Sequence, residues 1–229
     1  MSELKVEERS IVIPGETLAE GMDFLPGDNT YRKDQRIYSK SLGSVSLSGR
    51  VVKIIPLAGP YLPTIGDRIV GRIKDILMSG WRIDFGSAYS AVMNVKDAST
   101  RFIKKREDLS KILEIGDIVF VQITNVTSQN LIDITMTEPG LKKLTGSRLI
   151  KISSQKVPRV IGKKGSMITL VKEKSGCEIN VGQNGIVSIR GSPEGELLAE
   201  KAIKLIEKEA HLSGLTDKMT KFLAAGGKQ

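Results

Sequence analysis

The feature that most limits the fold of this chain is a nine-residue segment with the sequence Val-Ile-Gly-Lys-Lys-Gly-Ser-Met-Ile. Two glycines, Gly162 and Gly165, enclose Lys163 and Lys164, and apolar pairs flank them on both sides. Glycine adopts backbone angles closed to other residues and lets a second backbone approach closely. Amides at the start of a helix point outward with the positive end of the helix dipole. We therefore predict a loop between two short helices that directs amides and two ammonium groups at phosphates.

Strand and helix patterns around this loop give a fixed order of elements. The prediction is a strand over 148–152, a helix over 157–161, a second helix over 166–175, strands over 177–181 and 186–190, and a long helix over 193–211. Ser166 can cap the second helix, Gly176 can end it, and Ser192 with Pro193 starts the last one. The order is thus strand, helix, loop, helix, strand, strand, helix.

This order resembles the KH domain, whose Ile-Gly-x-x-Gly-x-x-Ile frame is complete in Ile161, Gly162, Gly165 and Ile168. The resemblance implies that the loop binds a few nucleotides of single-stranded RNA backbone, with Arg159 on the preceding helix as a further cation. The alternative is a plain turn between two core helices, with its lysines exposed to solvent.

The positive charge of the chain is concentrated around the same loop. The net charge is +9, yet residues 1–62 hold 8 basic and 8 acidic side chains, and residues 63–137 hold 10 and 9. Residues 138–229 hold 17 basic and 9 acidic side chains. A local basic surplus is the electrostatic pattern expected of a protein that binds a phosphate backbone. A lysine-rich surface without function would not explain this concentration.

The length of 229 residues favours two or three domains. We predict a multidomain protein, mainly β plus α+β, with a small N-terminal β-domain over 1–62, a five-stranded OB-fold barrel over 63–137, and a type I KH domain over 138–229 whose tail from Ala224 is disordered. The first domain has too few apolar runs for a large core, so we expect it to pack against the next domain or another chain.

Five short strands separated by tight turns are predicted in the second segment, which is typical of a small closed barrel. The segment resembles the OB-fold RNA-binding domain named after a ribosomal small-subunit protein, through Gly66-Asp67, Gly71, Gly80, Phe85-Gly86, Leu113 and Gly116-Asp117. In that family, aromatic and basic side chains on the second and third strands face RNA.

The resemblance makes four side chains of this segment candidates for RNA contact: Trp81, Phe85 and Tyr89 for stacking, and Arg82 as a cation. Trp81, Ile83 and Phe85 share one face of a strand, so one or two of them must belong to the core. Packing inside the barrel is an equally supported interpretation for Trp81 and Phe85. The family's dense aromatic and histidine cluster is missing, which predicts weak or sequence-independent binding.

Across nearly its whole length the chain resembles the RNA-binding cap subunit of the archaeal exosome. The further motifs are Ile13-Pro14-Gly15, Tyr61-x-Pro63-x-x-Gly66-Asp67 and Gly182-Gln183-Asn184-Gly185. The resemblance implies that Gly182, Asn184 and Gly185 pack between the KH domain and the barrel. It also implies that three copies cap a ring of six RNase PH-like subunits, with the N-terminal domain on the ring. Single-stranded RNA would then be threaded 3′ end first to phosphorolytic sites.

The sequence predicts no catalytic residue, no metal site and no cofactor. Motifs of zinc proteases, serine hydrolases and nucleotide-binding loops are missing, and so is a carboxylate cluster of the metal-dependent nuclease type. Cys177 is the single cysteine and is expected to be buried and inert. His211, the single histidine, is interpreted as a surface residue. No signal peptide or membrane anchor is recognisable, so we expect a cytoplasmic protein.

Two other functions are compatible with these modules. A free-standing transcription or translation factor with OB and KH domains would be a monomer of about 25 kDa. A fragment of polynucleotide phosphorylase would also pair the two domains. In that enzyme, however, the KH domain precedes the barrel, and its catalytic core has no counterpart here.

Overall fold

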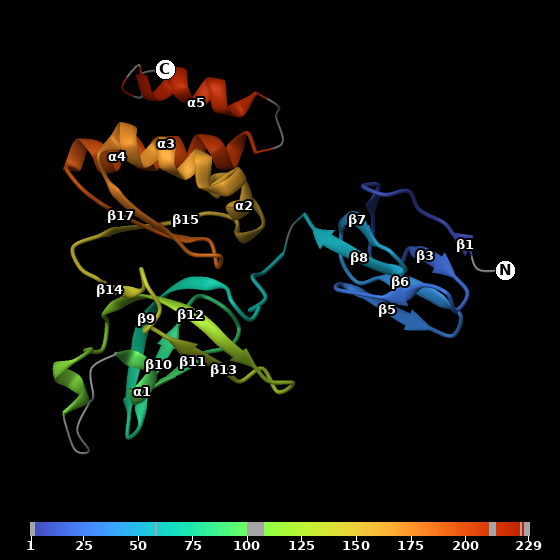
Figure 1. Cartoon of the computed structure of the whole chain (residues 1–229), viewed down its shortest axis with the longest axis horizontal. Coiled ribbons are helices and arrows are strands. Elements are labelled where there is room, and N and C mark those ends of the chain that lie inside the picture. Colours follow the sequence, from blue (N-terminus) through green and yellow to red (C-terminus); the bar gives the residue numbers. More distant parts are fainter. Residues whose placement is uncertain (1–2, 58, 100–107, 211–213, 225, 227–229) are drawn as a thin grey trace. The chain divides into compact units, whose positions relative to one another are not determined.

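The computed structural model of the chain describes residues 3–57, 59–99, 108–210, 214–224 and 226. The chain divides into two compact units, residues 1–59 and residues 60–229 (Figure 1). His211 and the charged connector predicted over 101–107 lie outside the described residues.

The N-terminal unit consists of two small sheets. One contains β1 (Glu3–Leu4), β3 (Thr17–Glu20), β6 (Arg36–Ser39) and β5 (Thr30–Lys33), in this order. The other contains β2 (Ile11–Val12), β7 (Gly43–Ser48), β8 (Val51–Pro56) and β4 (Leu25–Pro26). A tight hairpin joins β7 to β8 at Gly49, whose φ is 62°. One face of each sheet supplies the core, formed by Val12, Leu18, Ala19, Ile37, Val45, Val52 and Ile54.

The first part of the second unit is the predicted five-stranded OB barrel. Its strands are β9 (Arg68–Leu77), β10 (Gly80–Asp84), β11 (Ala91–Asn94), β12 (Ile118–Val126) and β13 (Ile132–Thr135). They follow the order β13-β11-β10-β9-β12, and the pairing of β12 with β13 closes the barrel. The parallel pairing of β11 with β13 marks the Greek-key connection. Between these strands lie a short helix α1 (Val95–Ala98) and a 3-10 turn η1 (Leu109–Lys111).

A sixth strand, β14 (Lys142–Leu144), pairs with β12 and extends the barrel sheet past Thr137, where the sequence-based segment ends. A turn at Gly146 then leads into the KH domain.

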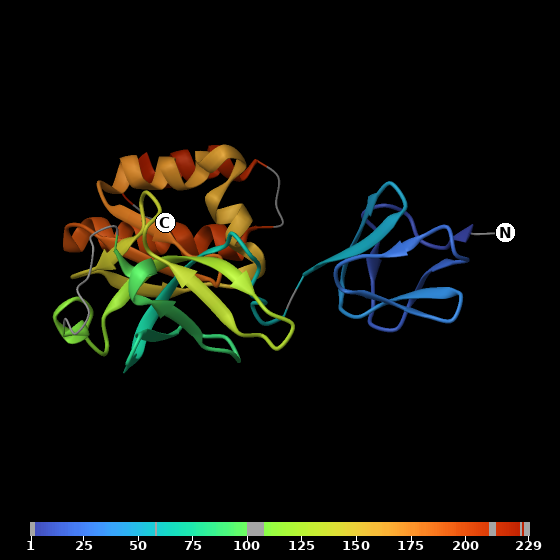
Figure 2. The ribbon, with the colours of Figure 1, turned by 60° about the horizontal axis from the view of Figure 1, so that its bottom comes forward.

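The KH domain has the predicted order of elements: β15 (Arg148–Lys151), η2 (Ser154–Lys156), α2 (Val157–Ile161), η3 (Lys163–Gly165), α3 (Ser166–Ser175), β16 (Glu178–Val181), β17 (Ile186–Arg190) and α4 (Pro193–Lys208). The sheet is antiparallel in the order β15-β17-β16. Its helices lie on the face away from the barrel (Figures 1 and 2). As predicted, Gly176 ends α3 in the left-handed conformation, and the Ser192 hydroxyl caps α4 at the Gly195 amide.

Two sequence-based expectations for this domain need correction. Ser166 does not cap α3: it is the first helical residue, and the cap position belongs to Gly165. The C-terminal end forms a further helix, α5 (Leu215–Ala224), so Ala224 is helical rather than the start of a disordered tail. Residues Leu215, Met219, Phe222 and Leu223 of this helix are buried in the KH core against α3 and α4.

Candidate nucleic-acid interface

The loop between α2 and α3 owes its shape to three residues with positive φ. Gly162 has φ 76°, Lys164 has φ 54° and Gly165 has φ 81°. A Cβ at Gly162 would lie 2.7 Å from the Cβ of Met167, so only glycine leaves room there. At Gly165 a Cβ would meet nothing within 4 Å, so this glycine is needed for its backbone angle alone.

The apolar residues that frame the loop fix it to the domain. Val157 and Val160 of α2 and Met167 and Val171 of α3 are buried in the KH core. The Gly162 amide donates to the carbonyl of Pro158 at 2.9 Å and ends α2, and the Gly165 amide donates to the carbonyl of Gly162 at 3.1 Å and closes the loop. The two helices therefore hold the loop in one conformation and present it at the surface.

The loop displays cations to solvent. Lys163 and Lys164 have exposed side chains, and the exposed Arg159 lies one turn earlier on α2. Gly162 and Gly165 are partly exposed between them. The five residues of this domain that were predicted to contact RNA thus lie together at the surface.

The barrel corrects the prediction for two aromatic residues. Trp81 and Phe85 are 0% and 1% exposed, and Ile83 between them is equally buried. The indole Nε1 of Trp81 donates to the backbone carbonyl of Leu113 at 3.0 Å, which satisfies its one polar group inside the core. Neither ring can stack on a base, because all the inward positions of β10 fill the barrel.

The other two candidates in the barrel remain accessible. Arg82 is exposed on β10, where its cross-strand neighbours are Asp75 on β9 and Val92 on β11. Tyr89, between β10 and β11, is 39% exposed. Sequence reasoning missed Arg72 and Lys74, which alternate with buried residues of β9 and are also exposed. In the sequence, Arg72 and Lys74 lie on either side of the apolar Ile73, and this alternation could have predicted that both cations face outward.

This outer face of the barrel carries mixed charge. Asp84 is the cross-strand neighbour of Arg72, and Asp75 that of Arg82. Carboxylates beside the cations weaken the attraction for a phosphate backbone. The KH loop, by contrast, has no acidic residue between Arg159 and Lys172.

The Gly182–Gly185 turn joins the KH domain to the barrel. The Asn184 side chain donates to the carbonyls of Val70 at 2.8 Å and Phe85 at 2.7 Å, and accepts from the Val70 amide at 3.3 Å. A Cβ at Gly182 would lie 2.8 Å from the Val70 nitrogen. At Gly185, φ is 80° and a Cβ would lie 2.2 Å from the carbonyl oxygen of Ile152.

Apolar contacts extend this junction. Val70, Phe120, Leu141 and Leu144 form a buried cluster with partly buried residues that include Leu149 and Ile186 of the KH sheet. The barrel and the KH domain are therefore one body, consistent with their assignment to a single compact unit.

Two further properties hold for the described part of the chain. It contains no cluster of three His, Cys, Asp or Glu side chains placed to bind a metal ion. None of its helices combines the length and apolar composition needed to cross a membrane. Cys177 is buried, as predicted.

A closed OB barrel joined to a KH domain, with a framed GxxG loop and a local surplus of cations, defines a multidomain RNA-binding protein. Three family models match the chain: the exosome RNA-binding protein RRP4 N-terminal domain over residues 9–58, the RRP4 S1 domain over 60–111, and the KH domain over 147–208.

Relatives agree over nearly the full length. Exosome complex component Rrp4 of Methanothermus fervidus is 40% identical over 220 residues, covering 96% of this chain and 97% of the relative. The protein of the same name from Thermococcus kodakarensis is 41% identical, covering 97% and 88%. A crystal structure assigned to an exosome complex RNA-binding protein has a TM-score of 0.64 and 32% identity, covering 73% of this chain and 97% of that one. The chain belongs to the Rrp4 family of exosome RNA-binding proteins, which is a non-catalytic family.

Proposed function

We propose that this chain is a cap subunit that captures single-stranded RNA and feeds its 3′ end to a phosphorolytic ring of RNase PH-like subunits. The observation that carries the RNA-capture part is the GxxG loop, whose positive-φ backbone displays Lys163 and Lys164 beside partly exposed glycines. Amides and ammonium groups at one place are suited to contacts with phosphates rather than with base edges.

The barrel would contribute a second, weaker contact. Tyr89 offers an accessible ring for base stacking, and Arg82 offers a guanidinium beside Asp75. The mixed charge of this face supports binding that depends little on sequence. Since the barrel and the KH domain form one body, both contacts would act on the same strand from fixed positions.

The N-terminal unit supports the proposal that this protein docks on other subunits. Ile11 of β2 and Ile55 of β8 lie in register on either side of Ser44 of β7, and they are 67% and 55% exposed. Leu42 and Leu57, joined by a backbone hydrogen bond just beyond the paired ends of β7 and β8, are also exposed, and so is Ile13, two residues after Ile11. Contiguous exposed apolar side chains on a small sheet are typical of a protein–protein interface.

The assembly around this docking surface would contain three copies of the chain on one ring, and it would act in the cytoplasm. The relatives named exosome complex component Rrp4 support membership of such an assembly. Because the family is non-catalytic, we expect the ring subunits to cleave the RNA and this chain to bind and deliver it.

The test is affinity purification of the tagged full chain from cells, with mass spectrometry of the retained proteins. RNase PH-like subunits should co-purify with the wild type and with the control Leu131→Ser, which changes an exposed apolar residue of the barrel. The double variant Ile11→Ser/Ile55→Ser should lose them while keeping its RNA affinity. A wild-type protein that purifies alone as a 25.0 kDa monomer would contradict the proposal and favour a free-standing RNA-binding factor.

A further inference from the structure

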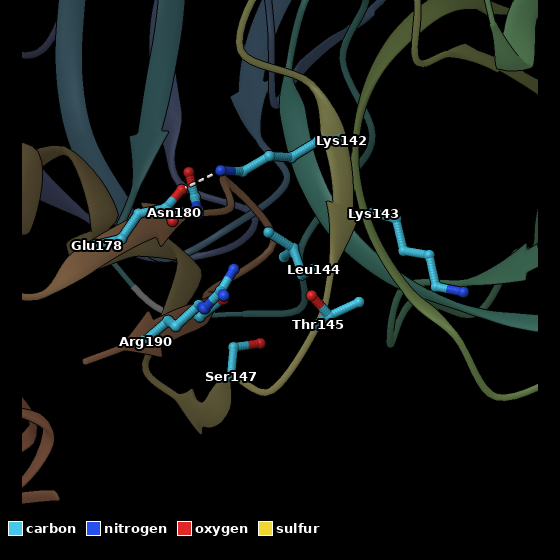
Figure 3. Close-up of a pocket in the computed structure, with 9 residues that line it drawn as sticks. Lys142, Lys143, Leu144, Thr145, Ser147, Glu178, Asn180 and Arg190 are labelled. Carbon is cyan, nitrogen blue, oxygen red and sulfur yellow. Dashed lines mark hydrogen bonds and ion pairs between the residues drawn. The ribbon is translucent and has the colours of Figure 1, made fainter. Parts of the chain in front are cut away.

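A small pocket lies between the barrel strand β14 and the face of the KH sheet opposite the helices (Figure 3). Its polar lining residues are Lys142, Lys143, Thr145, Ser147, Glu178, Asn180, Ser188 and Arg190. It leaves about 40 Å³ for the centres of water-sized molecules, whereas one water needs roughly 10–15 Å³. The space therefore admits a small polyatomic ion and excludes a nucleobase.

Strand β17 explains why polar groups gather at this place. Val187 and Ile189 face the helices and are fully buried in the KH core, so Ser188 and Arg190 must point to the opposite face. The register then places Asn180 beside Ser188 and Glu178 beside Arg190. An inner sheet face that packs on another domain is ordinarily apolar, and here its centre is polar.

Ser188 is the observation that points to a ligand. Its side chain is 1% exposed, and its hydroxyl has no hydrogen-bond partner among the described residues. A buried hydroxyl without a partner is unfavourable. The hydroxyl lies on the wall of the pocket, so a bound group in the pocket would supply the missing partner.

The charges of the pocket favour an anion. Lys142 pairs with Glu178 across the junction, and the hydrogen bond from Lys142 lowers the pKa of that carboxyl, which is therefore ionised at neutral pH. Lys143 points away from the other lining residues (Figure 3), and its ammonium pairs with Asp117. Arg190 forms no salt bridge among the described residues, but its charge also helps to lower the pKa of Glu178, its cross-strand neighbour. Lys142 and Arg190 therefore face a single carboxylate, Glu178, which leaves a net charge of +1 next to three hydroxyls.

We propose that this pocket binds a phosphate group, held by the Arg190 guanidinium and the hydroxyls of Thr145, Ser147 and Ser188. A planar guanidinium matches the oxygens of a phosphate, and hydroxyls can donate to the remaining ones. The source is either free inorganic phosphate or a phosphate of the RNA strand. The site is separate from the GxxG loop, because the loop joins two helices on the other face of the KH sheet.

The test uses the full chain and inorganic phosphate, followed by ³¹P NMR line broadening and by calorimetry. Saturable binding is expected, and Arg190→Gln should weaken it roughly 10-fold or more, as for the loss of a charged hydrogen-bond donor. Ser188→Ala should also weaken it while leaving the melting temperature unchanged or higher, because it removes a hydroxyl that has no partner in the protein. Arg50→Gln removes the same charge from an exposed turn of the N-terminal unit and should bind phosphate like the wild type.

A second arm distinguishes the two sources. A short single-stranded RNA is titrated with and without inorganic phosphate, at constant ionic strength. If phosphate competes and Arg190→Gln lowers RNA affinity, the site binds a phosphate of the strand; if phosphate binds without competition, it binds the free ion. The proposal is overturned if phosphate does not saturate the wild type, or if Arg190→Gln and Ser188→Ala bind it unchanged. Neither result would affect RNA binding by the GxxG loop, which is tested by separate variants.

Discussion

Asn184 of the KH domain pairs with both backbone groups of Val70 in the barrel: its Nδ2 donates to the Val70 carbonyl at 2.8 Å, and its Oδ1 accepts from the Val70 amide at 3.3 Å. The same Nδ2 also donates to the carbonyl of Phe85 at 2.7 Å. One buried side chain thus satisfies three backbone groups of another domain, and only an amide has both the donor and the acceptor to do so.

We expect Asn184→Ala to lower the free energy of unfolding by roughly 2–4 kcal/mol, because it leaves buried backbone groups without partners. Asn184→Asp should be nearly as damaging, since a carboxylate cannot donate to the two carbonyls. Urea denaturation measures the change. The control Asn125→Ala, which removes an exposed amide that contacts Asp133, should stay within about 0.5 kcal/mol of the wild type. Equal effects of the two alanine variants would show that the junction adds nothing to stability.

Gly185→Ala should destabilise the protein more than Gly146→Ala does. Both glycines have positive φ, 80° and 61°, so both variants carry backbone strain of about 1–2 kcal/mol. Only at Gly185 would the new Cβ collide with a backbone, at 2.2 Å from the Ile152 oxygen, whereas at Gly146 nothing lies within 4 Å. The difference between the two unfolding free energies, expected to be roughly 1–3 kcal/mol, measures the collision. Indistinguishable values would mean that the turn moves away at no cost.

Lys163→Ala/Lys164→Ala should weaken binding of single-stranded RNA and reduce its dependence on salt. Each lost phosphate contact lowers the slope of log affinity against log salt by about 0.7 for a single strand, so the pair should lower it by about 1.4. Fluorescence anisotropy at several salt concentrations measures the slope. The control variant Lys172→Ala/Lys174→Ala removes the same charge from the last turn of α3, away from the loop. Its slope of log affinity against log salt should stay close to that of the wild type. An unchanged slope in the loop variant would place the RNA elsewhere.

Trp81→Ala and Tyr89→Ala should separate the core of the barrel from its surface. Trp81→Ala empties a fully buried site and leaves the Leu113 carbonyl without its donor, so we expect a loss of roughly 3–5 kcal/mol in stability. Tyr89→Ala should change stability little and should weaken RNA binding by about 1–3 kcal/mol if the ring stacks on a base. Melting curves and anisotropy titrations give the two quantities. An unaltered RNA affinity for Tyr89→Ala would exclude this ring as a stacking platform.

Acid should weaken the contact between the barrel and the KH domain. The hydrogen bond from Lys142 holds the pKa of Glu178 below its ordinary value of 4.5. A carboxyl with a lowered pKa stabilises the fold above its unfolded-state pKa, and this contribution is lost as the pH falls through the folded-state pKa. Wild-type stability should therefore decline as the pH drops below about 4.5, and Glu178→Gln should decline less over the same interval. Parallel declines in urea midpoints from pH 7 to pH 3 would show that this pair does not contribute.

Much of the KH domain could be predicted because its signals are local. The glycines of the loop, the Ser192-Pro193 helix start and the strand over 186–190 each depend on a few neighbouring residues, and the structure has all three. The helix α5 was missed although its signal was present: Leu215, Met219, Phe222 and Leu223 follow the helical period. Its place in the core needed a partner surface on α3 and α4, which a local pattern does not reveal.

The sequence by itself determined that Trp81, Ile83 and Phe85 share one face of a strand, and that cations gather around the GxxG loop. It could not determine which side of the strand the closed barrel would enclose, because an apolar interior and a stacking surface both select aromatic residues. Closure by the pairing of β12 with β13 decided that question and buried all three. The pocket beside β14 is likewise a product of tertiary structure: its lining combines Lys142 of β14 with Ser188 and Arg190 of the KH sheet, and these residues come together only where the two domains pack.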